Sequence, residues 1–113
     1  MVHLFLHFIV PLTVALAFYR PHWLSAAVIL LATMAVDVDH LLANPIYDPA
    51  RCSIGFHPLH TLPAIAFYIL LFAAPVARRL DARLALPKTA ERVMHLVGFG
   101  LLIHMALDAT DCL

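Results

Sequence analysis

The sequence predicts an all-α protein: an integral membrane four-helix bundle with antiparallel, up-down topology and a polar, metal-binding layer at its outer end. Three observations lead to this prediction. The 113-residue chain is 64% hydrophobic and 12% charged, which leaves too little polar surface for a soluble domain of this size. It contains four apolar segments of nearly membrane-spanning length. Most of its histidines and aspartates stand at one end of those segments. We therefore expect residues 1–113 to form a single transmembrane domain.

The first two predicted spans, residues 4–19 and 23–42, are joined by the short basic segment "RPH". Such a short connection makes the two helices antiparallel neighbours. Pro11 lies inside the first span and is expected to kink it unless neighbouring groups satisfy the freed carbonyl. The second span carries no charge until it ends in "DVDH", at residues 37–40.

The third and fourth predicted spans are residues 58–77 and 93–110. Pro58 suits the first turn of a helix, where a missing N–H costs little. The first and fourth spans are short, so helix tilt or local thinning of the bilayer is expected.

Charge sets the predicted orientation. The connections 20–22 and 78–92 are basic, and in a four-span protein they lie on the same side. The positive-inside rule places them in the cytoplasm of a bacterial inner membrane, with both termini and the 43–56 loop outside. The net charge is zero and no basic patch is present, so the sequence gives no sign of nucleic-acid binding.

On this topology every helix brings polar side chains to the outer end. Histidines three or four residues from a second histidine or an aspartate share a helix face. His22 and His95 fall on the cytoplasmic side instead. The predicted metal ligands are His3, His7, Asp37, His40, His57, His60, His104 and Asp108.

The acidic charge of this layer favours a bound cation. Ionised side chains near mid-bilayer are costly, and several carboxylates beside neutral histidines repel one another unless a proton or a metal is added. Imidazole together with carboxylate is a ligand set for zinc, and it also accommodates iron, manganese or nickel. We expect one or two divalent ions, zinc first. The alternative is a structural hydrogen-bond network without metal.

Three residues are candidates for catalysis. Asp39 points away from Asp37 in an ideal α-helix, so it joins the centre only if the helix end unwinds or faces a neighbour; otherwise it serves to hold a ligating histidine. Asp39 or Asp111 is the predicted general base. Arg51, in the outer loop, is a candidate to bind a phosphate oxygen, or it pairs with Asp48.

The two cysteines, Cys52 and Cys112, both fall on the outer side of the predicted topology. That compartment is oxidising. We predict a Cys52–Cys112 disulfide that fastens the outer loop over the end of the fourth helix. Two thiols, or a thiol that ligates metal, are the alternatives.

The motifs "MAVDVDHLL", "HPLHT" and "HMALD" resemble those of an uncharacterised family of small bacterial membrane-bound metal-dependent hydrolases. The "RCSIGFHPLH" segment and the cysteine near the end resemble a smaller uncharacterised family over nearly the whole chain. Scattered residues are also similar to zinc-dependent phospholipase C and related nucleases, which are all-helical. The residues that match the motifs of the metal-dependent hydrolase family are the acidic pair Asp37 and Asp39, then His60 with Thr61, and then His104 with Asp108. His57 departs from the family pattern.

These features favour a metal-dependent hydrolase at the outer membrane interface, acting on a phosphoester or a lipid. The expected partners are therefore membrane lipid and such a substrate, with the oligomeric state left open. The alternatives are a metal-binding membrane protein without catalysis, and a structural or partner protein whose polar layer holds the helices together. Transport is disfavoured because no ionisable track continues to the cytoplasmic side.

Overall fold

The computed structural model describes residues 2–42, 52, 54–80 and 88–110, except for the side chains of residues 2–4, 40 and 78–80. Over these ranges every regular element is a helix and no strand occurs, which confirms the all-α prediction. The four α-helices are α1 (Val2–Phe18), α2 (Trp23–Ala32), α3 (Leu62–Leu80) and α4 (Lys88–Thr110). Three 3₁₀ segments accompany them: η1 (Arg20–His22), η2 (Thr33–Leu42) and η3 (Pro58–His60).

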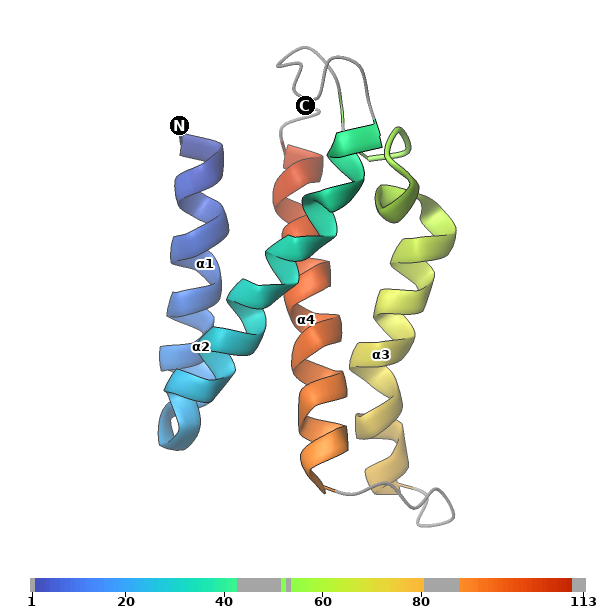
Figure 1. Cartoon of the computed structure of the whole chain (residues 1–113). Coiled ribbons are helices and arrows are strands. Elements are labelled where there is room, and N and C mark those ends of the chain that lie inside the picture. Colours follow the sequence, from blue (N-terminus) through green and yellow to red (C-terminus); the bar gives the residue numbers. More distant parts are fainter. Residues whose placement is uncertain (1, 43–51, 53, 81–87, 111–113) are drawn as a thin grey trace.

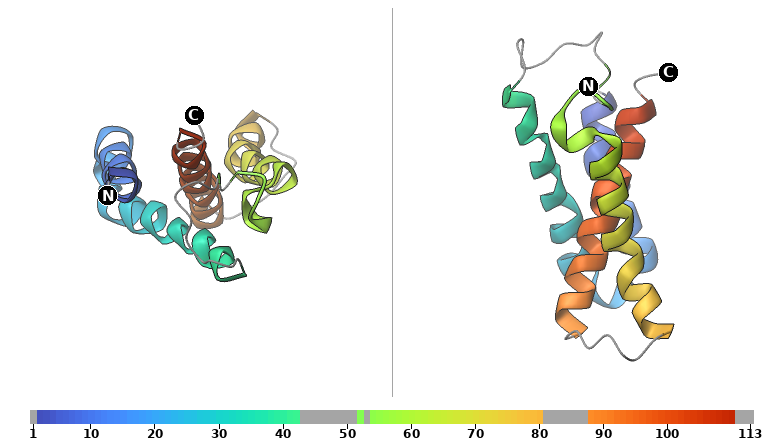
Figure 2. Two further views of the ribbon diagram at one scale, coloured as in Figure 1. Left: turned by 90° about the horizontal axis from the view of Figure 1, so that it is seen from above. Right: turned by 90° about the vertical axis from the view of Figure 1, so that its right-hand side faces the viewer.

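Helix α4 is the central element. It packs against α1, α2 and α3, whereas α1 and α3 lie on either side of it (Figures 1 and 2). The start of α1, the end of η2, the η3 turn and the end of α4 all lie at one end of the molecule (Figure 1). The three elements η2, η3 and α4 therefore meet at the end of the molecule that carries Asp37, Asp39 and Asp108, which we call the acidic end.

The second helical segment changes its winding part of the way along. α2 ends at Ala32, and the chain continues from Thr33 as the 3₁₀ segment η2. The Thr33 hydroxyl donates a hydrogen bond to the Leu30 carbonyl at this junction. A 3₁₀ helix has three residues per turn, so residues three apart share a face. Thr33, Val36 and Asp39 are accordingly all buried.

Two helices start four or five residues away from the start of the predicted span. α3 begins at Leu62 rather than Pro58, because Thr61 is extended (φ −86°, ψ 164°) and separates the η3 turn from the helix. α4 begins at Lys88, since the polar residues "KTAER" continue the helix beyond its apolar part. Pro11 lies inside α1 without ending it.

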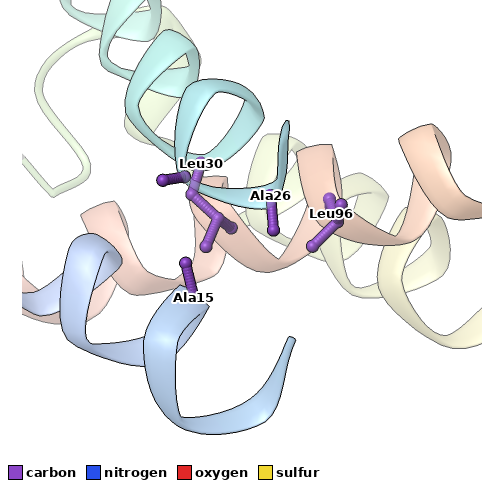
Figure 3. Packing of buried hydrophobic residues seen from close by; sticks show 5 residues of the cluster. Ala15, Ala26, Leu30 and Leu96 are labelled. Carbon is purple, nitrogen blue, oxygen red and sulfur yellow. The ribbon is translucent and has the colours of Figure 1, made fainter. Parts of the chain in front are cut away.

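Small side chains form the centre of a hydrophobic cluster between α1, α2 and α4. Ala15, Ala26 and Ala27 pack together with Leu30 and Leu96, and all five are buried (Figure 3). Alanines at a helix crossing let the backbones approach closely, which is typical of helix packing in membranes. This cluster joins α1, α2 and α4.

The two glycines of α4 mark its closest contacts. A Cβ at Gly98 would lie 2.5 Å from the Phe72 backbone nitrogen of α3. A Cβ at Gly100 would lie 2.5 Å from Thr33 Oγ1 of η2. Gly98 and Gly100 therefore allow α4 to pack closely against two neighbours.

His95 of α4 contacts Phe72 of α3 and Tyr19, the residue that follows α1. His95 Nδ1 donates to the Phe72 carbonyl at 3.0 Å, so its Nε2 accepts the Tyr19 hydroxyl hydrogen at 2.9 Å. The His95 ring also stacks on Phe72, with 4.6 Å between ring centroids. Both ring nitrogens are thus engaged in interhelical contacts, and His95 is a structural residue.

Two helical stretches, Arg20–Asp39 and Lys88–Thr110, are long and apolar enough to cross a membrane. Phe5–Phe18 and Leu62–Ala77 are shorter apolar helices. Many large apolar side chains on all four helices are exposed, among them Phe18, Leu24, Leu62 and Leu70.

Candidate metal centre

Four ionisable side chains meet at the acidic end of the molecule. Asp37 comes from η2, His60 from η3, and His104 and Asp108 from successive turns of α4. One potential ligand atom from each of these residues lies within 4.8 Å of the others. We call this group the Asp–His cluster.

The contacts inside the Asp–His cluster converge on two histidine nitrogens. His104 Nε2 lies 2.9 Å from Asp37 Oδ1 and 3.3 Å from Asp108 Oδ2. His60 Nε2 lies 2.9 Å from the same Asp108 oxygen and 3.5 Å from the same Asp37 oxygen. The two imidazoles therefore point their Nε2 atoms at a shared pair of carboxylate oxygens.

Two further buried residues hold the cluster from outside. Asp39 Oδ2 lies 3.0 Å from His60 Nδ1 and accepts the Leu59 backbone N–H at 2.8 Å. His7 Nε2 lies 3.1 Å from Asp108 Oδ1. Each of these contacts uses the atom of His60 or Asp108 that faces away from the cluster. Such partners orient a ligand and fix the tautomer of a histidine.

The cluster is buried on three sides and open on one. The exposed fractions of the His60, His104 and Asp108 side chains are 0%, 2% and 4%. That of Asp37 is 41%. Asp37 is therefore the member of the cluster that solvent reaches.

The surroundings of His60 favour its protonated form in the absence of metal. Burial lowers the pKa of His60, but hydrogen bonds to Asp108, Asp37 and Asp39 outweigh this and raise the pKa to about 10. Both ring nitrogens face carboxylates. A metal ion at Nε2 would therefore replace a proton, while Nδ1–H keeps its bond to Asp39.

The donor set suits a divalent ion. Two imidazole nitrogens and two carboxylate oxygens are the ligand types that zinc uses. Zinc holds such atoms at about 2.0–2.2 Å, so ligands on one ion lie within about 4 Å of each other. The observed spread of 4.8 Å is slightly larger than this value. Three carboxylates around two histidines also supply the negative charge that a cation neutralises.

The other predicted site residues have different positions. His57 is buried, with its ring 5.6 Å from that of His60 and 5.0 Å from that of Phe56, and it lies outside the four-residue cluster. The side chains of His3 and His40, and residues Arg51, Asp111 and Cys112, fall outside the described part of the chain. The Cys52–Cys112 disulfide therefore stays a prediction.

One supporting residue was not singled out in the sequence. The buried Tyr68 of α3 donates its hydroxyl hydrogen to the Leu59 carbonyl at 2.8 Å and so holds the turn that carries His60. A tyrosine within an apolar helix needs a partner for its O–H. This requirement predicts a hydrogen-bond partner for Tyr68, but it does not identify the Leu59 carbonyl as that partner.

Asp39→Asn tests the outer support of the cluster. The amide keeps the shape of Asp39 but loses the charge that holds His60 Nδ1–H. We expect zinc affinity to fall by about 10- to 100-fold, the usual effect of such a change. Competition with a fluorescent chelator measures this affinity. An affinity equal to that of the wild type would show that Asp39 does not position the ligand.

The fold and the site together define an all-helical protein with a buried Asp–His cluster at one end of its helices. The chain belongs to a family of unknown function (DUF6122), whose model matches residues 1–94. Asp37 and His60 lie inside the matched stretch, whereas His104 and Asp108 follow it. No curated protein and no solved structure matches this chain.

Proposed function

We propose that the protein is a membrane-embedded, metal-dependent hydrolase that acts at the outer membrane interface. The observation that carries this proposal is the Asp–His cluster, in which three side chains are almost fully buried and the fourth is open to the surroundings. Closed zinc sites are typically structural, whereas catalytic sites have three protein ligands and one open position.

The distribution of charge supports insertion of an antiparallel bundle into the inner membrane. The described Lys and Arg side chains are Arg20 in η1, and Lys88 and Arg92 in the first part of α4. Both η1 and the start of α4 lie at the end of the molecule opposite the cluster (Figure 1). The positive-inside rule assigns that end to the cytoplasm. The cluster then lies near the outer surface, where an apolar substrate and water both have access.

We assign the ligand role to His60, His104 and Asp108. These two histidines and one carboxylate match the His₂-carboxylate composition of several catalytic zinc sites. A divalent ion bound there supplies Lewis-acid polarisation of the scissile group and a lowered pKa for water. Asp39 and His7 hold two of the ligands in place through their outer atoms.

We assign the general base to Asp37. Its carboxylate adjoins both ligating histidines and is the exposed member of the cluster, so it can accept a proton from the attacking water. Asp39 is engaged by His60 and by the Leu59 N–H, which makes it a positioning residue in this scheme. Asp111 and Arg51 remain predicted contributors.

Asp37→Asn is the test of this function. Zinc-loaded wild type and variant are screened against nitrophenyl esters and phosphoesters and against a fluorogenic amide. With any substrate that the wild type cleaves, we expect kcat to fall by about 10²- to 10⁴-fold, the usual contribution of a general base, while the metal content stays within twofold. Glu91→Gln, the same chemical change at the far end of α4, should leave kcat unchanged.

Elemental analysis of the same preparations separates the alternatives. Metal-loaded protein that cleaves none of these substrates would contradict the hydrolase and favour a metal-binding protein without catalysis. Protein that carries no metal, and whose stability is unchanged by chelator, would favour a purely structural polar layer.

A further inference from the structure

An apolar groove runs along α4 below the Asp–His cluster. Its volume is about 510 Å³, and it opens between α2 with η2 on one side and α3 on the other. Val93, Val97 and Leu101 form its floor, and Ala32 and Val36 are part of one wall. The described residues that line it include no charged side chain, and Thr33 and Tyr68 are the polar ones.

The groove is long and narrow. Val93, Val97 and Leu101 follow one another at intervals of four residues, which extends the floor over about 12 Å of helix. A volume of about 510 Å³ over that length corresponds to a mean cross-section of about 40 Å². A helix about 10 Å across has a cross-section of about 80 Å². The groove therefore suits an extended chain better than a helix of a second protein or a second copy.

The upper end of the groove adjoins the cluster. His104 follows Leu101 by three residues on α4, a rise of about 4.5 Å. Asp37 follows Val36 directly along η2. Tyr68, at the same end, donates to the carbonyl of Leu59, the residue before His60. An apolar site and a polar, cation-binding site therefore lie about one helical turn apart.

We propose that this groove holds one acyl chain of a membrane phospholipid, with the phosphate-bearing headgroup at the Asp–His cluster. This inference rests on the proposed function and names its substrate class. The chain matches the uncharged lining, and an anionic phosphate oxygen matches a divalent ion held by the cluster. The exposed apolar side chains of Val38 and Leu41 lie beside Asp37 on η2, where the rest of the lipid would approach.

Photolabelling of the full chain tests the groove. The probe is lysophosphatidylglycerol with a diazirine in its acyl chain, added to zinc-loaded protein in dodecyl maltoside and mapped by mass spectrometry. We expect labelling concentrated in residues 28–36 and 93–101, and at least a fivefold loss with excess unlabelled lysophosphatidylglycerol. Ala32→Phe fills the groove from the α2 wall and Val97→Phe fills it from the floor, and each should lower that labelling at least fivefold.

Ala66→Phe is the matched control, because Ala66 is exposed on α3 and does not line the groove. Its labelling should equal that of the wild type. Three results would each contradict binding of an acyl chain in the groove. They are uniform labelling of all exposed helix faces, labelling that unlabelled lipid does not reduce, and an equal loss of labelling in Ala66→Phe. Zinc content is measured on the same samples. Normal zinc content with non-specific labelling overturns the lipid site alone, whereas competed labelling without bound zinc supports the lipid site and contradicts the hydrolase.

Discussion

Purified His104→Ala protein is expected to carry less than a tenth of the zinc bound by the wild type. His104 Nε2 contacts both Asp37 and Asp108. Its removal therefore takes away one proposed ligand, and both carboxylates lose a neighbouring imidazole. Tight metal binding requires the full number of ligands in the right geometry, so the remaining donors hold the ion less tightly. Elemental analysis by inductively coupled plasma mass spectrometry measures the change.

His95→Ala is the matched control for this experiment. His95 is on the same helix and is hydrogen-bonded as well, but its partners are Tyr19 and the Phe72 carbonyl. We expect its removal to lower the thermal midpoint while the zinc content per chain stays within twofold of the wild type. Full zinc occupancy in His104→Ala would contradict the assignment of the cluster as the metal centre.

Gly98→Ala is expected to destabilise the fold by about 1–3 kcal/mol, the usual cost of overpacking. The added Cβ would lie 2.5 Å from the Phe72 nitrogen and 2.9 Å from the Leu71 carbonyl carbon, so α3 and α4 must move apart. In an unhindered helix the same change stabilises by roughly 0.8–1 kcal/mol. The measured loss of stability is therefore smaller than the energetic cost of the clash itself. Thermal or denaturant unfolding in detergent, followed by tryptophan fluorescence, measures this loss.

Gly100→Ala provides the comparison, because its added Cβ would meet the Thr33 side chain rather than a backbone. We expect Thr33→Ala to restore most of the stability lost in Gly100→Ala, as a non-additive double-mutant cycle. Shortening a side chain cannot fully relieve the clash in Gly98→Ala, because the closest contact of the added Cβ is the Phe72 backbone nitrogen. Equal or greater stability of Gly98→Ala would show that α3 and α4 do not pack as closely as described.

Much of the fold was predictable because apolar segments and their connections carry a strong signal. The four helices follow from composition and from segment length. The boundaries at Leu62 and Lys88 were harder to place, since hydropathy does not detect an extended residue such as Thr61 or a polar helical turn such as residues 88–92.

The candidate site was predictable where ligands share one helix. His104 and Asp108 are four residues apart on α4, and this spacing brings them to one face. The position of Asp39 depends on the local winding. An α-helix of 3.6 residues per turn directs it away from Asp37, whereas the 3₁₀ segment η2 aligns it with the buried Thr33 and Val36.

The contacts between elements could not be derived from spacing alone. His7 with Asp108, and Asp39 with His60, depend on how α1 and the η3 turn pack around α4. The sequence indicates that these residues reach the same end of the molecule. It does not say which of them faces the cluster directly and which one holds a neighbour.

The hydrogen bonds of the cluster also constrain how the protein is made. The pairs His7–Asp108 and His104–Asp37 are separated by 101 and 67 residues, so the centre forms only after the last helix has been synthesised. Until then Asp37 lacks its α4 neighbour His104 within an apolar chain, and such long-range closure is slow compared with helix formation. On the proposed assignment of the cluster, a ribosome-stalled chain that stops before residue 104 lacks His104 and Asp108 and is expected not to retain a metal ion.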